Sequence, residues 1–232
     1  MTDSSIIVAL DFPDEASTMQ LVDRINPELC RLKIGKELFT RCGPDLVKKI
    51  VNSGYDVFLD LKYHDIPNTV ANACKAAADL GVWMMNVHAL GGPAMLAAAR
   101  NALSDADSPL LIAVTILTSS SDDDLKAVGI NQSAKDMVKQ LALLSKHQGL
   151  DGVVCSAQEA GDLKSDLGHD FILVTPGIRL PADDAGDQKR IVSPADAIRQ
   201  GSDYLVIGRP ITQADDPIQK LLTVNSEISH CI

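Results

Sequence analysis

The segment Asp60–Thr69 holds the densest group of side chains that could do chemistry. It contains Asp60 and Lys62 at the end of an apolar run that is typical of a buried strand. Side chains alternate along a strand, so these two residues should share one face while Leu61 points to the other. Burying such an ion pair for stability alone is costly, because desolvation offsets much of the attraction. The pattern therefore favours a catalytic lysine flanked by carboxylates.

Asp65 follows the same run and has two interpretations. A loop could return its carboxylate towards Lys62 or extend it to a neighbouring chain. Alternatively, Asp65 could cap the N-terminus of a helix that the chain enters through Pro67. The residues alone leave both interpretations open.

A second group of residues with chemical potential follows the last two apolar runs. It comprises residues 175–179 (Thr-Pro-Gly-Ile-Arg), the Gly-Asp-Gln of residues 186–188, and Gly208-Arg209. Glycine lets backbone N–H groups approach an anion closely, and an arginine can bind a phosphate in bidentate fashion. This group predicts a phosphate site. The polar, glycine-containing segment 182–189 is expected to be a mobile lid over it.

Alternating apolar runs and helical patterns must position these groups. The expected strands cover 5–11, 29–34, 56–62, 82–88, 110–115, 152–155, 171–175 and 204–207, and the expected helices cover 14–25, 36–53, 66–80, 93–103, 133–148, 157–167, 194–200 and 217–228. Residues 118–129 are expected to form a long polar loop. Eight such units without a composition break predict one α/β domain over residues 1–232, a (β/α)8 TIM barrel. A doubly wound sheet would usually open on G-x-G-x-x-G, whereas Asp11-Phe12-Pro13 stands there.

A barrel would bring the polar strand ends together, because the carboxyl ends of its strands form one rim that carries the active site. The strand ends with polar side chains or a Gly-Arg pair are Asp11, Lys33, Asp60, Lys62, Asn86, His88, Thr115, Thr175 and Gly208-Arg209. The loops after the seventh and eighth strands are the usual phosphate site of this fold. Both groups of candidate residues are therefore expected at the same rim.

Composition limits the partners. The 232 residues carry a net charge of −10, so the surface as a whole should repel nucleic acid and anionic lipid. The start of the chain has no basic segment typical of a signal peptide, and no apolar stretch reaches the roughly 18 residues of a membrane helix. Five scattered cysteines predict reduced thiols and a cytoplasmic location. We expect no nucleic-acid or membrane partner.

The chemically interesting residues also resemble a known family. Asp60–Thr69 resembles the D-x-K-x-x-D-I-P-x-T signature of the orotidine monophosphate decarboxylases. The similarity extends over nearly the whole chain and includes residues 8–11, 33–35, 87–89, 113–119, 174–179, 185–188 and 206–210. The ten-residue signature is specific, whereas the Gly-Arg loop is shared by many phosphate-binding barrels.

The resemblance implies decarboxylation of orotidine 5′-monophosphate to UMP and CO2, the last step of de novo pyrimidine biosynthesis, without cofactor or metal. Lys62 would lie next to C6 and donate the proton that replaces CO2, with Asp60 against the substrate carboxylate. Asp65 and Thr69 would reach into the partner's site in a homodimer. The other implied substrate contacts are Asp11 and Lys33 at the ribose, Thr118 and Ser119 at the pyrimidine, Gln188, Gly208 and Arg209 at the phosphate, Arg179 in or near the phosphate loop, and Pro176.

Three other functions fit parts of the pattern. A Mg²⁺-dependent keto-sugar-phosphate decarboxylase of the same superfamily shares D-x-K, but it usually resembles E-x-G where this chain has Lys33-Ile34-Gly35. A lysine cannot coordinate Mg²⁺ as that glutamate would. An aldolase would use Lys62 as a Schiff-base nucleophile, but flanking carboxylates keep a lysine protonated. A non-catalytic sugar-phosphate-binding barrel would be expected to have lost a charge from Asp60, Lys62 or Asp65.

Overall fold

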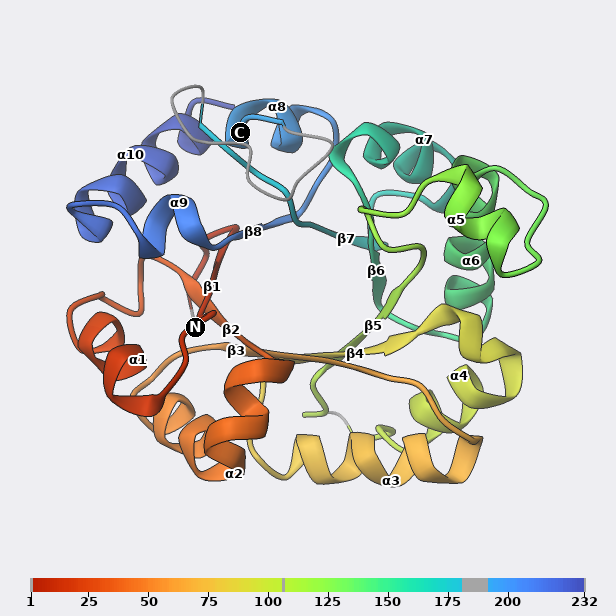
Figure 1. Cartoon of the computed structure of the whole chain (residues 1–232), viewed down its shortest axis with the longest axis horizontal. Helices are drawn as coiled ribbons and strands as arrows, with labels where there is room; N and C mark the ends of the chain where they lie inside the picture. The colour runs from red at the N-terminus through yellow and green to blue at the C-terminus, as the bar shows by residue number, and fades with distance from the viewer. Residues whose placement is uncertain (1, 106, 181–191, 232) are drawn as a thin grey trace.

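Eight parallel strands close into a barrel, and helices surround it (Figure 1). The computed structural model describes residues 2–105, 107–180 and 192–231. The strands are β1 (Ile6–Ala9), β2 (Arg31–Gly35), β3 (Val57–Tyr63), β4 (Met84–His88), β5 (Leu110–Val114), β6 (Gly152–Val154), β7 (Ile172–Thr175) and β8 (Tyr204–Ile207). Each strand pairs with the next in the chain, and β8 pairs back with β1. The predicted TIM barrel is confirmed.

The helices follow the strands in the expected order. They are α1 (Glu15–Val22), α2 (Lys36–Asn52), α3 (Pro67–Ala78), α4 (Gly92–Asn101), α5 (Asp122–Ala127), α6 (Ala134–His147), α7 (Ala157–Leu167), α8 (Pro194–Arg199), α9 (Arg209–Thr212) and α10 (Pro217–Ser229), with a 3₁₀ turn η1 (Ala89–Gly91) before α4. The helix expected over residues 36–53 is kinked at Gly43, whose φ of 68° leaves the helical region. Among the described residues, no helix combines the length and apolar character needed to span a bilayer.

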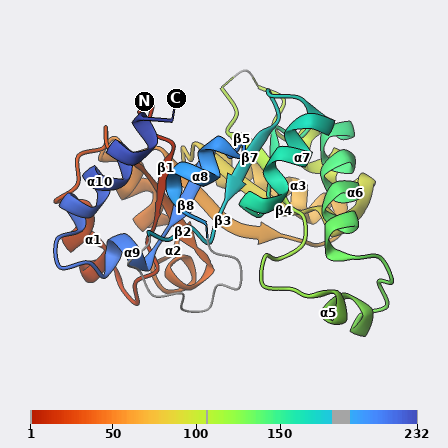
Figure 2. The same cartoon turned by 90° about the horizontal axis from the view of Figure 1, so that it is seen from above.

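Two short helices correct the sequence-based prediction. Residues 118–129 are not a continuous loop, because α5 lies inside them, and α9 follows β8 directly. The reason for α5 is a capping box: the Ser121 hydroxyl accepts the Asp124 amide, and the Asp124 carboxylate accepts the Ser121 amide. Figure 2 shows α5 projecting beyond one side of the barrel, while the end of α10 lies on the other side.

Two apolar layers hold the barrel together. Inside it, Phe58, Met84 and Ile112 belong to a small buried cluster, and a much larger cluster fills the space between strands and helices. Leu59 and Leu61 pack in this outer cluster, whereas Asp60 and Lys62 face the barrel mouth. The predicted alternation along β3 is therefore present, and it aims the two charges away from the apolar layer.

The amino end of the barrel is closed by a stacked cation. The Arg31 guanidinium lies 4.4 Å from the centre of the Trp83 ring and 5.0 Å from that of Tyr204, and its Nε pairs with Asp56 at 3.3 Å. Such stacking suits the planar, weakly hydrated guanidinium. This end is packed for stability, so the carboxyl ends of the strands are left to carry the functional groups.

Candidate active site

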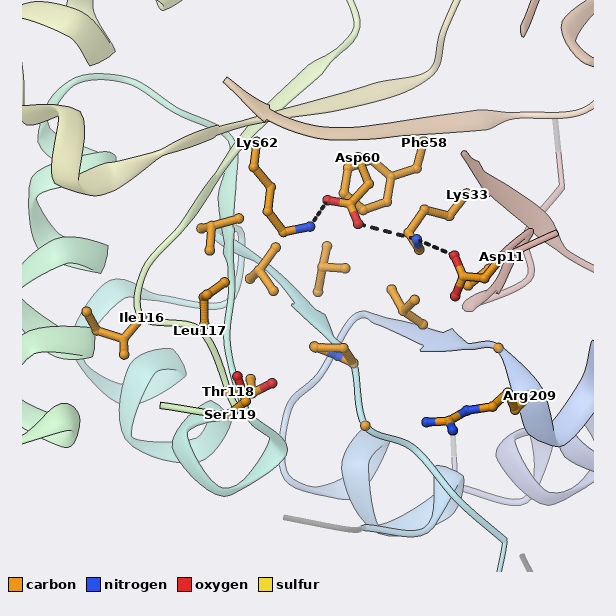
Figure 3. Close-up of a pocket in the computed structure, with 18 of the residues that line it drawn as sticks. Asp11, Lys33, Phe58, Asp60, Lys62, Ile116, Leu117, Thr118, Ser119 and Arg209 are labelled. Carbon is orange, nitrogen blue, oxygen red and sulfur yellow. Dashed lines mark hydrogen bonds and ion pairs between the residues drawn. The ribbon is translucent and has the colours of Figure 1, made fainter. Parts of the chain in front are cut away.

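A cavity of about 410 Å³ opens at the carboxyl ends of the strands, within the size range of small-molecule sites. The predicted site residues that line it are Asp11, Lys33, Asp60, Lys62, Thr118, Ser119, Pro176, Arg179, Gly208 and Arg209. Figure 3 shows Asp11, Lys33, Asp60 and Lys62 along one wall, with Arg209 below the Asp11 end of this row. Gln188 and the expected lid 182–189 lie outside the described residues.

Four alternating charges form one wall of the cavity. Lys33 Nζ lies 3.4 Å from Asp11 Oδ1 and 3.4 Å from Asp60 Oδ2, and Lys62 Nζ lies 2.6 Å from Asp60 Oδ1. The residues come from the ends of three neighbouring strands, because Asp11 follows β1, Lys33 lies in β2, and the other two lie in β3. Each lysine is therefore held in place by a carboxylate, and Asp60 bridges the two lysines (Figure 3).

Asp60 is the centre of this array and is ionised at neutral pH. Burial alone would raise the pKa of its carboxyl, since only 13% of the side chain is exposed. The positive charges of Lys33 and Lys62 outweigh that penalty. With hydrogen bonds from Lys62 and Asn86, they bring the pKa of Asp60 below its ordinary value. The cavity therefore presents a fixed carboxylate in direct contact with an ammonium group.

Asn86 is a contact that the sequence did not mark out as a site residue. It was only one of several polar strand ends, but its fully buried amide donates to Asp60 Oδ1 at 2.6 Å and accepts from the Lys62 amide at 2.8 Å. Only the pairing between β3 and β4 reveals this role. The sequence does not contain a local pattern that gives the register of these two strands. Two other polar strand ends, Thr115 and Thr175, are also fully buried. Their hydroxyls form hydrogen bonds within the barrel wall.

The rest of the cavity rim is formed by the loops after β5, β7 and β8, and the last of these adjoins Asp11, because β8 pairs with β1. Thr118 and Ser119 come from the first, Arg179 from the second, and Gly208 with Arg209 from the third. Four cations and two carboxylates line the described cavity, which gives a formal charge of +2 in a chain whose net charge is −10. Such local concentration of positive charge favours an anionic ligand.

Asp65 and Thr69 stand apart from this cavity. Both are exposed, and neither lines it within the single chain. Asp65 accepts the Ile66 amide at 2.6 Å. Its interpretation as a helix cap is wrong, because the N-cap of α3 is Ile66, with no side-chain hydrogen bond. The carboxylate is also not returned to the cavity, which leaves contact with a neighbouring chain as the remaining interpretation.

Comparison with known proteins decides the family. A model of the family described as "Orotidine 5'-phosphate decarboxylase / HUMPS family" matches residues 4–224. The chain belongs to this family.

Similar members of the orotidine 5′-phosphate decarboxylase family align along nearly the whole chain. The decarboxylase of Saccharophagus degradans is 58% identical over 228 residues, covering 98% of this chain and 96% of the relative. That of Shewanella sediminis is 58% identical over 231 residues, covering 99% of both. The crystal structure of the Lactobacillus acidophilus enzyme has a TM-score of 0.86 and 41% identity, covering 96% of this chain and 98% of that one.

His88, at the end of β4, is a partly buried histidine outside the cavity lining. Burial lowers the pKa of its imidazole to about 4, with smaller contributions from His64, Lys36 and Lys62. Among the described residues, its buried Nδ1 has no hydrogen-bond partner, and its ring centre lies 5.5 Å from that of His64. The neutral imidazole therefore fits the fold, whereas the imidazolium does not.

This predicts a loss of stability between about pH 6.5 and pH 4. In that range the unfolded chain binds a proton at His88 that the folded chain does not, so the free energy of unfolding falls as the pH falls. Denaturant titrations at several pH values should show a shallower fall for His88→Gln than for the wild type. The exposed His147→Gln is the control, and it should follow the wild type. Equal slopes for all three proteins would contradict the prediction.

Proposed function

We propose that the chain is a carboxy-lyase that decarboxylates orotidine 5′-phosphate to UMP and CO2, in pyrimidine biosynthesis. Two relatives named for this activity align with nearly the whole chain at 58% identity. The observation that carries the proposal in physical terms is the Lys62 ammonium, fixed 2.6 Å from the Asp60 carboxylate at the cavity wall. The Lys62 ammonium is an acid held beside a carboxylate in a positively charged cavity. This arrangement fits a reaction in which a carbanion forms and is then protonated.

The chemistry needs no electron sink other than electrostatics. The C6–carboxyl bond breaks, CO2 leaves, and the electron pair stays on C6 without an adjacent carbonyl to delocalise it. A positive charge placed beside C6 stabilises the developing carbanion. Lys62 then transfers a proton to C6 as a general acid and regains one from solvent. In the described part of the chain, no cluster of three His, Cys, Asp or Glu side chains could hold a metal ion.

The substrate's charges can be matched to the cavity's two sides. We propose that Arg209 and Gly208, with Gln188, bind the phosphate, and that Arg179 lies near it. The ribose hydroxyls would bind Asp11 and Lys33, and the pyrimidine would lie by Thr118 and Ser119, with Pro176 as a further contact. In this pose, the base extends towards Lys62, so the phosphate supplies binding energy remote from C6. The excess of positive charge in the cavity supports this arrangement.

The direct test follows the ultraviolet absorbance of the orotate ring in the presence of purified protein and excess EDTA. Conversion to UMP that continues in EDTA is the expected result. Folded protein that forms no UMP would contradict the proposal, and keto-sugar phosphates with Mg²⁺ would then be tested as substrates. Lys33 favours the first outcome, because it stands where the Mg²⁺-dependent relatives would place a metal-binding glutamate and is already paired with Asp11 and Asp60.

We also propose that the active form is a homodimer in which Asp65 and Thr69 complete the partner's site. Both are exposed, Asp65 just before α3 and Thr69 in its first turn, outside the cavity of their own chain. Large apolar side chains at the same rim are also exposed: Ile66 by 67%, Leu90 by 42% and Leu117 by 46%. Covering these side chains with a second copy would bury apolar surface and bring charged groups to the neighbouring cavity.

A mixed-dimer experiment tests this arrangement. Lys62→Ala and Asp65→Ala are each expected to be nearly inactive, because each lacks one group from every site. After denaturation and refolding together in equal amounts, half of the dimers should be mixed, and one of their two sites should carry both native residues. The mixture should therefore recover about a quarter of the wild-type activity. No recovery, with mixed dimers demonstrated by differently tagged chains, would exclude a shared site.

The cytoplasmic location stays a prediction. It is supported by the cysteines, all five of which are free thiols. Burial raises the pKa of the Cys30 and Cys74 thiols to about 12, so both behave as small apolar side chains and not as reactive groups.

A further inference from the structure

Asn86 lies opposite an irregularity in β3. The two strands pair at Leu59↔Met85, and their next pair is Tyr63↔Val87. Between these pairs β3 advances four residues whereas β4 advances two, so the backbone of β3 bulges and Asn86 alone stands across from it. Bulges interrupt the ladder of hydrogen bonds and re-aim side chains, and they are common beside active sites.

Lys62 lies in this bulge with an unusual backbone. Its φ of 54° falls in the left-handed region, and no other non-glycine residue of the described chain has a positive φ. A side chain with a Cβ disfavours that region, so neighbouring groups must hold it there. Asn86 Oδ1 does so by accepting the Lys62 amide at 2.8 Å. The asparagine side chain thus takes the place of the missing strand pairing.

The other end of the same amide holds the lysine's counter-ion. Asn86 Nδ2 donates to Asp60 Oδ1 at 2.6 Å, and Lys62 Nζ donates to that same oxygen at 2.6 Å. The amide orientation follows from its partners, since a backbone N–H can only donate and an ionised carboxylate can only accept. Asn86 is fully buried and does not line the cavity, so it acts on the reaction through Asp60 and Lys62.

We propose that Asn86 is a positioning residue for decarboxylation: its amide fixes the bulge that aims the Lys62 ammonium and orients the Asp60 carboxylate beside it. The inference rests on the proposed function, because it assigns the lysine's placement to a residue outside the cavity. Both an acceptor and a donor are needed at position 86. An isosteric side chain that offers both an acceptor and a donor only when it is protonated should therefore make kcat depend on the protonation of that side chain.

Asn86→Asp is that change. The new carboxyl can accept the Lys62 amide in either state, but it can donate to Asp60 only when protonated. Ionised, it would place two carboxylates in contact, and such a pair shares a proton with strongly coupled titration. The logarithm of kcat plotted against pH should then gain an ionisation that the wild type lacks. On its alkaline side kcat should fall by about 100-fold, the usual effect of a misplaced catalytic group, while KM changes little.

The matched control is Asn225→Asp. Asn225 also bridges two segments, because its amide donates to the main-chain oxygens of Leu29 and Leu221 and accepts from Ser4 Oγ, far from the cavity. Its kcat, counted per UMP-binding site, should keep the wild-type pH profile. If the Asn86→Asp profile also keeps the wild-type shape, whatever its height, the positioning role is wrong.

A second variant covers the possibility that Asn86→Asp does not fold. Asn86→Ser is smaller and cannot span both partners, so kcat per UMP-binding site should fall with KM nearly unchanged. An unchanged kcat would overturn the inference. Absence of UMP formation by the wild-type protein would contradict the proposed function itself, whereas an active wild type with an unaltered Asn86→Asp profile contradicts only the role of Asn86.

Discussion

Lys62→Ala is expected to lower kcat for orotidine 5′-phosphate by at least about 10⁴-fold, because it removes both the charge beside C6 and the acid that protonates it. The ammonium group lines the cavity, and contact with Asp60 at 2.6 Å holds it there. The measurement is the absorbance change of the orotate ring under single-turnover conditions, with enzyme in excess over substrate. This separates the chemical step from product release.

The control must show that the loss is local. Asp60 keeps its contact with Lys33 at 3.4 Å in the variant, so the fold and the binding of UMP should persist. Lys48→Ala removes an exposed lysine from α2 and should leave kcat unchanged. A Lys62→Ala protein that binds UMP and retains more than about a tenth of the wild-type kcat would show that Lys62 is not the acid.

The fold was predictable because burial leaves a strong mark on parallel strands. β8 and α7 have the predicted bounds, and the other strands and long helices differ mainly by a few residues at their ends. The failures have physical causes. A six-residue helix such as α5 is too short to show an apolar period of 3.6 residues in the sequence. Its one sequence signal is the Ser121–Asp124 capping box. The kink at Gly43 lies inside a helical pattern that continues on both sides.

The site was predictable as far as strand ends and loop chemistry define it. The barrel brings Asp11, Lys33 and Asp60 to one wall because they end neighbouring strands. Asn86 could not be assigned in this way, because its role depends on a register shift between two strands that no local pattern encodes. Asp65 shows a second limit of prediction from the sequence. Its carboxylate lies outside the cavity of its own chain, and local spacing does not indicate a role across an interface.

Asp60→Asn is the second change with a large expected effect, and kcat should fall by about 10²–10³-fold. The ionised carboxylate holds Lys62 at 2.6 Å and Lys33 at 3.4 Å, and a neutral amide cannot attract either ammonium group in the same way. The fall should be measured per UMP-binding site. The exposed Asp123→Asn, whose side chain is 93% exposed, is the control and should match the wild type.

The same variant separates two contributions of Asp60. If its charge repels the carboxylate of the bound substrate, removing the charge should strengthen binding of orotidine 5′-phosphate relative to UMP by at least about tenfold, because these ligands differ only in that carboxylate. If Asp60 only positions Lys62, both affinities should change by the same factor. With chemistry slowed, KM for the substrate approaches its dissociation constant, so the two affinities can be compared directly. We expect the ratio to change, because Asp60 is ionised at the cavity wall and stands next to Lys62, the proposed proton donor. If the ratio of the two affinities is unchanged, the whole effect of Asp60 on kcat comes from its placement of Lys62.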